Sequence, residues 1–180
     1  NEINGGSIRV HIVHKSNKAY KPTKSLKQKI YLENYFFKNN IDIFKSRVMS
    51  SKKLIFDFLT NLSKNNLIYG YGASTKGNII LNHCNIDTKK IKYIADGNSQ
   101  KWGRRTPGLN IKIISKEKMR KMRPDYLLVL IWSFRSEVIK QEKRFILNGG
   151  KLILPLPFFH IIDKENYKKY EKESLDSFSF

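Results

Sequence analysis

The sequence is poor in cysteine and has no long apolar run. Its single cysteine, Cys84, excludes an internal disulfide and a cysteine-rich metal site, and its apolar helical surroundings predict a buried structural thiol. No apolar stretch approaches the roughly 18 residues that a membrane-spanning helix needs. A signal-peptide pattern is also absent. We therefore expect a cytoplasmic protein with no membrane partner.

Acidic residues are scarce as well. The chain has 15 Asp and Glu against 35 Lys and Arg, which gives a formal net charge of +20 over 180 residues. Such a charge is typical of nucleic-acid-binding proteins. Here, however, the cations are scattered, and the densest groups, Lys89-Lys90 and Lys168-Lys169, are short. We expect attraction to anionic small molecules and no specific nucleic-acid partner.

The most informative stretch is a glycine-rich loop between an apolar strand and a helix. The strand begins at Leu67, glycines follow at 70, 72 and 77, and an apolar helical pattern starts near residue 75. Glycine permits close backbone approach, and the free N–H groups of the first helical turn attract phosphates. The loop residues that we expect to contact a ligand are Gly70, Gly72, Ser74, Thr75 and Lys76.

This loop matches neither standard nucleotide fingerprint. Thr75 stands where a dinucleotide-binding loop has its third glycine, and Lys76 precedes Gly77 where a Walker A loop has Gly-Lys-Ser/Thr. Neither NAD binding nor ATP hydrolysis follows. Two interpretations stay open: a nucleotide or phosphate site, and a tight strand–helix turn whose glycines serve packing only.

Strand and helix patterns alternate from residue 67 to residue 154. After the first strand, we expect strands at 91–95, 111–114, 126–131 and 151–154. This alternation predicts an α/β fold, a Rossmann-like and mostly parallel sheet flanked by helices, with the most apolar strand at its centre. Ahead of the sheet, the pattern predicts an N-terminal strand at 7–14 and two helices, at 25–39 and 42–64. The second of these helices carries an apolar stripe that includes Phe44 and Leu59. Between the strands, we expect a short helix with Ser115 as its N-cap and a longer helix that runs from Trp132-Ser133-Phe134 to about Leu147.

In such a sheet the ligand lies beyond the carboxyl ends of the strands. Besides the glycine loop, those ends carry Asp96 with the loop 98–108, and Trp132 and Ser133. Asp96 follows the first glycines by about 25 residues, where an acidic side chain often binds a ribose hydroxyl; it could equally cap the turn at Gly97-Asn98. Trp132 either lines the cleft or packs against the core. We expect no metal site.

Several motifs together carry a family resemblance. In order they are Gly5-Gly6-Ser7-Ile8-Arg9-Val10, Gly70 to Asn78, Asp96 with Asn98, Gly103-Arg104 with Thr106-Pro107-Gly108, and Trp132-Ser133-Phe134. This series resembles the C-terminal domain of SAM-dependent sugar C-methyltransferases, which act on nucleotide-linked deoxysugars. The resemblance implies that this chain helps to hold the nucleotide-linked sugar, while SAM and zinc belong to upstream domains and this chain carries no cofactor of its own.

The resemblance also implies a division of the chain. Residues 1–15 would be the terminal strand of the upstream methyltransferase domain, 16–65 a linker and helical bridge, 66–163 the Rossmann-like domain, and 164–180 a helical and polar tail. Because the sequence begins with Asn1 and enters a strand-like segment almost at once, we expect functional parts upstream.

The chemistry that the resemblance implies is methylation of a carbon beside a sugar ketone. A base removes the α-proton, and the stabilised enolate attacks the methyl group of SAM. Family members often carry histidine just before the Gly-Gly-Ser turn, where this chain has Asn4, so the catalytic base is not identified. The alternative function is a non-catalytic binding or scaffolding domain for an anionic partner.

Overall fold

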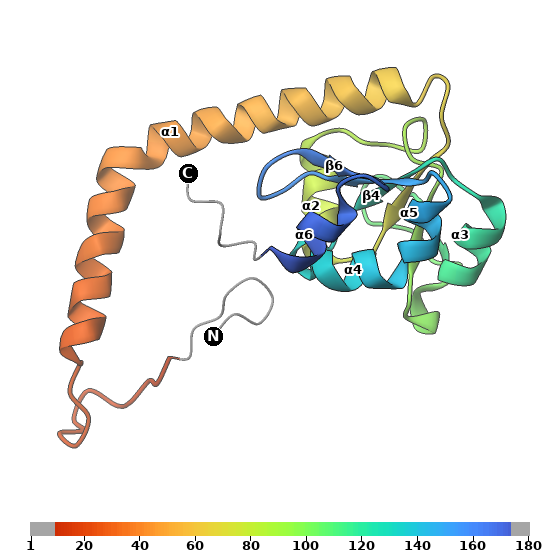
Figure 1. The fold of residues 1–180 in the computed structure, drawn as a ribbon. Helices are drawn as coiled ribbons and strands as arrows, with labels where there is room; N and C mark the ends of the chain where they lie inside the picture. Colours follow the sequence, from red (N-terminus) through yellow and green to blue (C-terminus); the bar gives the residue numbers. More distant parts are fainter. Residues whose placement is uncertain (1–9, 174–180) are drawn as a thin grey trace. The chain divides into compact units, whose positions relative to one another are not determined.

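The computed structural model describes residues 10–173, and the chain divides into two compact units, residues 1–50 and 51–180. The first described element is α1 (Lys24–Leu62), a helix of 39 residues that begins in the first unit and ends in the second (Figure 1). Within residues 10–173, all strands and the other helices belong to the second unit. The sheet and its helices can therefore be described on their own.

A six-stranded sheet forms the centre of the second unit, in the order β3-β2-β1-β4-β5-β6. The first five strands pair in parallel, and β6 pairs antiparallel with β5. The strands are β1 (Ile68–Tyr71), β2 (Tyr93–Asp96), β3 (Lys112–Ser115), β4 (Tyr126–Val129), β5 (Lys151–Leu154) and β6 (His160–Ile162). The predicted α/β class, the mostly parallel sheet and the central place of the 126–131 segment are confirmed.

Helices cover both faces of the sheet because the strand side chains alternate between two apolar clusters. One cluster joins Tyr69, Leu127 and Leu152 to the helices α3 (Lys116–Met122), α4 (Arg135–Gln141), α5 (Lys143–Leu147) and α6 (Tyr167–Lys172). The other joins Ile68 and Leu128 to α2 (Thr75–His83) and the end of α1. Two 3-10 helices, η1 (Ser99–Lys101) and η2 (Trp132–Phe134), follow β2 and β4.

The N-terminal part differs from the sequence prediction in two ways. One continuous helix, α1, replaces the two predicted helices, because the Asn39 and Asn40 side chains donate to the carbonyls of Tyr35 and Phe36 inside the helix and do not end it. Of the predicted strand at 7–14, residues 10–14 have no regular structure, and the rest lies outside the described residues. A strand needs a neighbour, and residues 10–14 pair with no strand of the part described.

Two details in the C-terminal half also differ. The helix expected from Trp132 to Leu147 is divided into η2, α4 and α5, with a break at Glu142, whose side chain is buried and turned toward Arg120. The antiparallel β6 was not predicted. By contrast, the predicted N-cap of α3 is present, since the Ser115 hydroxyl accepts from Lys118 N–H at 3.1 Å. Cys84 is buried, as expected.

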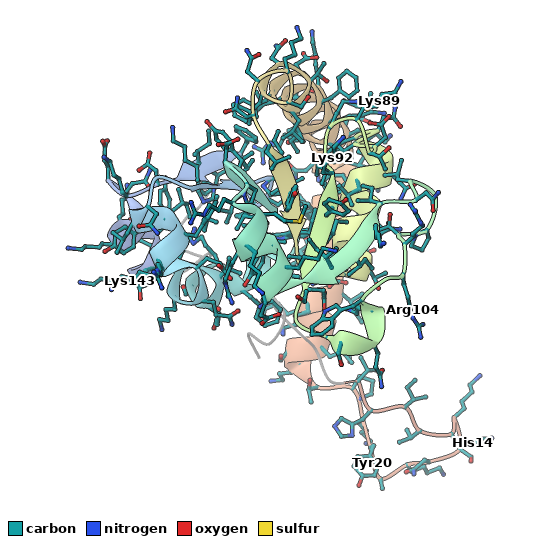
Figure 2. All side chains as sticks on the ribbon, turned by 90° about the vertical axis from the view of Figure 1, so that its right-hand side faces the viewer. His14, Tyr20, Lys89, Lys92, Arg104 and Lys143 are labelled. Carbon is teal, nitrogen blue, oxygen red and sulfur yellow. The ribbon has the colours of Figure 1, made fainter. Side chains whose placement is uncertain are left out.

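Lysine and arginine side chains are spread over different sides of the surface (Figure 2). Figure 2 shows Lys89 and Lys92, in the connection before β2, on one side of the sheet and Lys143 on another. Among residues 10–173, no helix is long and apolar enough to cross a membrane.

Candidate functional site at the carboxyl edge of the sheet

The strand order creates a switch point between β1 and β4. From β1 the chain continues through β2 and β3 to one side, whereas β4 leads through β5 to the other. At such a point the loops after the two strands diverge and leave a crevice, the usual ligand position in this architecture. Here the glycine loop follows β1, and η2 follows β4. The Ser74 hydroxyl links the two sides by donating to the carbonyl of Leu130 at 3.2 Å.

The glycines of the loop are required by packing. A Cβ at Gly70 would lie 2.8 Å from the Ile94 side chain, and one at Gly77 would lie 2.6 Å from the Cβ of Leu130. Gly72 has a φ of +87°, and its Cβ would lie 2.6 Å from Ile131. The packing interpretation thus accounts for all three glycines. Their presence neither requires nor excludes a ligand.

The first turn of α2 offers the groups that suit an anion. Ser74 is the N-cap, and its hydroxyl accepts from Gly77 N–H at 2.9 Å. Because this hydroxyl donates its proton to the Leu130 carbonyl, the Ser74 side chain has no donor left for an anion. The N–H of Thr75 has no acceptor among residues 10–173, and the side chains of Thr75 and Lys76 are exposed. The helix dipole adds to the attraction of a negative charge at this end.

Asp96 ties the glycine loop to the turn after β2. One carboxylate oxygen accepts from Asn98 N–H at 2.8 Å, and the other accepts from Ala73 N–H at 2.8 Å and from Lys101 Nζ at 3.3 Å. The residue is only 8% exposed. The turn-capping interpretation is therefore observed. Binding of a ribose hydroxyl stays a prediction for this largely covered carboxylate.

The sequence predicts the loop 98–108 at this edge but does not single out its first two functional candidates, Lys101 and Trp102. Lys101 Nζ donates to the Ala73 carbonyl at 2.8 Å as well as to Asp96, so its charge lies beside the glycine loop. The indole N–H of Trp102 donates to the Asp96 carbonyl at 2.8 Å, while 42% of the residue is exposed. The available signal was a cation and an aromatic residue directly after the Asp96 turn.

A cavity of about 230 Å³ lies beside the glycine loop. Its wall combines the start of α2 with the loop that follows η1, through Ser74, Thr75, Thr106 and Pro107. Asn78 also lines it, and the side-chain oxygen of Asn78 is buried without a hydrogen-bond partner in the described part of the chain. The cavity therefore combines apolar walls with the buried side-chain oxygen of Asn78, in the first turns of α2.

Comparison with known proteins decides the family. Residues 2–157 match the model of the C-methyltransferase C-terminal domain. The chain belongs to this family. C-methyltransferase NovU of Streptomyces niveus is 38% identical to it over 99 residues, which make up 55% of this chain and 24% of that relative. The aligned part is thus about a quarter of the relative's length.

In this C-methyltransferase C-terminal domain, the predicted site residues fall into three groups. Gly70, Gly72 and Asp96 are buried and shape the two loops, whereas Ser74, Thr75 and Lys76 form the cap and first turn of α2. Trp132 and Ser133 lie half-buried in η2, and Trp132 packs against the core cluster that contains Tyr69 and Leu127. The structure brings the first two groups together through the contact of Asp96 with Ala73.

Proposed function

We propose that this domain holds the nucleotide-linked sugar of a C-methyltransferase that methylates a carbon next to a sugar ketone. The supporting observation is the start of α2, where the N–H of Thr75 has no acceptor among residues 10–173 and the side chain of Lys76 is exposed. Lys101 and Asp96 hold the preceding loop through Ala73. A diphosphate is the anion that this combination of N–H donors, helix dipole and lysines suits.

Each residue of the site has a distinct task in this proposal. Thr75 and Lys76 bind the phosphates, and Lys101 adds charge while it holds the two loops together. Asp96 positions the glycine loop through Ala73 N–H. The exposed ring of Trp102 offers a stacking surface for a base or a sugar. Trp132 and Ser133 stand on the far side of the switch point, at the end of β4.

In this proposal the methyl donor is bound by an upstream part of the enzyme, and no catalytic base is assigned. Among residues 10–173, no group of three His, Cys, Asp or Glu side chains could hold a metal ion. In this proposal, the zinc expected in this family is bound by an upstream domain. SAM, also bound upstream, supplies the methyl group. The task of the described residues is to bind and orient the sugar so that its α-carbon faces that donor.

The decisive experiment removes single donors from the first turn of α2. Thr75→Pro deletes the N–H at the first helical position, where proline is tolerated. The preceding Ser74 is already extended (φ −111°, ψ 159°), as a residue before proline needs to be. We expect Thr75→Pro and Lys76→Ala each to weaken nucleoside diphosphate binding roughly tenfold, the worth of a hydrogen bond or ion pair to a charged group.

The controls separate the backbone donor from other effects. Thr75→Val removes the hydroxyl and keeps the N–H, and Lys89→Ala makes the same charge change on a distant exposed lysine. Both should bind nucleoside diphosphates, measured by calorimetry at 200 mM salt, as the unchanged chain does. Unaltered affinity in Thr75→Pro and in Lys76→Ala, with their melting temperatures preserved, would refute the proposed site.

A further inference from the structure

A second and larger cavity lies at the opposite end of the strands. Its volume is about 900 Å³, and its walls come from the end of α3, the junction of α4 and α5, and the Asn148–Gly150 turn. Asp125 and Gly150, which precede β4 and β5, also line it. This volume is typical of small-molecule sites in proteins. Nothing in the proposed nucleotide-sugar site accounts for this cavity.

Of the two acidic groups of this cavity, Glu142 is paired with an arginine and Asp125 accepts a backbone N–H with one oxygen. Glu142 accepts from Arg120 at 2.6 and 3.1 Å and from the Tyr71 hydroxyl at 2.9 Å. Asp125 accepts from Leu67 N–H at 2.7 Å. Burial, followed by the nearby Glu142, raises the pKa of Tyr71, so its hydroxyl stays a donor. Glu142 therefore neutralises Arg120 and has little capacity left for other cations.

Two arginines of the cavity have no such counter-charge. Arg123 and Arg144 both line it and are exposed, and neither forms an ion pair or a side-chain hydrogen bond within residues 10–173. A guanidinium group offers a planar fork of donors that matches the oxygens of a phosphate. The cavity thus presents two available phosphate-binding groups on different elements.

The backbone at Arg123 strengthens this assignment. Arg123 ends α3 in the left-handed conformation, with a φ of 48°. Helix ends of this kind favour glycine, because a Cβ is unfavourable there. Pro124 follows and prevents the helix from continuing. Glycine would adopt this backbone conformation at lower cost than arginine. The helix end therefore gives no structural reason for an arginine at position 123.

We propose that this cavity binds a phosphorylated small molecule, with Arg123 and Arg144 as the ligands of its phosphate. Phe145 and Asn148 also line this cavity. The site lies at the amino ends of β4 and β5, away from the carboxyl edge. Such a molecule is therefore a second ligand, bound independently of the nucleotide-linked sugar.

The test uses the full chain labelled with nitrogen-15 and titrated with inorganic pyrophosphate. We expect the amide signals of Gly149 and Gly150 to shift during the titration. Arg123→Gly should reduce the affinity at this site at least fivefold and at the same time raise the melting temperature, because glycine relieves the left-handed backbone. A merely unfolded variant would show a lower melting temperature. Arg144→Ala should reduce the affinity similarly.

Two matched controls and one competitor complete the design. Lys89→Ala and Lys76→Ala should leave the Gly149 and Gly150 shifts unchanged, since both lysines lie outside the cavity. Absence of these shifts at saturating pyrophosphate, or full affinity in both arginine variants, would overturn the proposal. A short polyglutamate peptide is titrated in parallel. Tighter binding of this peptide at the same amides would also overturn it, in favour of an acidic protein segment.

Discussion

Gly72 combines a positive φ with a crowded environment, and the two effects can be measured apart. Gly103 has nearly the same φ, +82° against +87°, but an added Cβ there would meet no atom within 4 Å. We expect Gly103→Ala to cost about 1 kcal/mol, from backbone strain alone. Gly72→Ala should cost a further 1–3 kcal/mol, because its methyl group must displace Ile131.

Urea denaturation of both variants tests this difference. Equal losses in the two variants would mean that Ile131 yields without resistance and that only the backbone demands glycine. In that case, loss of ligand binding in a Gly72 variant could be attributed to the ligand contact. With the expected result, such a loss would reflect damage to the fold, and the first turn of α2 remains the proper place for a binding test.

Single residues also mark the limit of reading a site from its sequence. The glycine loop and the Asp96 turn could be predicted because each is a local pattern of strand, turn and helix. Lys101 was not singled out because its role depends on reaching Ala73, 28 positions earlier in the chain. Glu142 has no local signal that distinguishes it, since only the three-dimensional structure brings Arg120 and Tyr71 to it.

At the scale of elements, the apolar stripe of α1 is buried near the end of the helix and exposed in its first half. Leu59 is fully buried against the sheet, whereas Phe44 on the predicted stripe is 57% exposed. We expect Leu59→Ala to reduce the free energy of unfolding by about 2–5 kcal/mol through the cavity it leaves. Phe44→Ala should change it by less than about 0.5 kcal/mol. Thermal unfolding of the two variants compares them directly.

A large loss of stability in Phe44→Ala would contradict this expectation and would show that the first half of α1 packs within this chain. The sequence could not tell the two halves apart, because amphipathic periodicity indicates a packing face and not its partner. The same limit explains β6. Its three residues pair with β5 only after a proline-containing connection, and nothing local distinguishes them from a loop.

The strand β6 begins with a buried histidine, His160, whose protonation opposes folding. The His160 ring stacks on Phe158 and Tyr170, with centroids 4.4 and 4.7 Å away, and its Nδ1 lies 2.9 Å from the Phe158 carbonyl. Burial lowers the pKa of His160 below its ordinary value. The unfolded chain therefore binds a proton at a pH where the folded chain does not.

This difference fixes the direction of the pH dependence. The contribution of His160 to stability is complete above its unfolded pKa of about 6.5 and declines as the pH falls below it, by at most about 1.4 kcal/mol per pH unit. We expect His160→Phe to lose less stability between pH 7 and pH 5 than the unchanged chain. Denaturant titrations at several pH values measure this, and parallel curves for the two proteins would contradict it.

At the scale of the whole molecule, the second unit contains the complete sheet, both apolar clusters and the two cavities. Residues 51–180 should therefore fold as an independent protein. We expect this fragment to unfold cooperatively, with a melting temperature within a few degrees of the full chain. Circular dichroism should show less helix in proportion to the missing part of α1. A molten or aggregated fragment would show that residues 1–50 are needed for folding.

The central pair of strands has a consequence for how the protein is made. β1 pairs with β2 and with β4, and in the second pairing Ile68 lies opposite Tyr126 and Tyr71 opposite Val129. In each of these two pairs, the paired residues are 58 positions apart in the sequence (126 − 68 and 129 − 71). On the ribosome, β1 therefore waits with one edge unpaired until residue 129 has emerged, and closing so long a loop is slow. A nascent chain stalled before β4 would expose this apolar edge to aggregation and to chaperones.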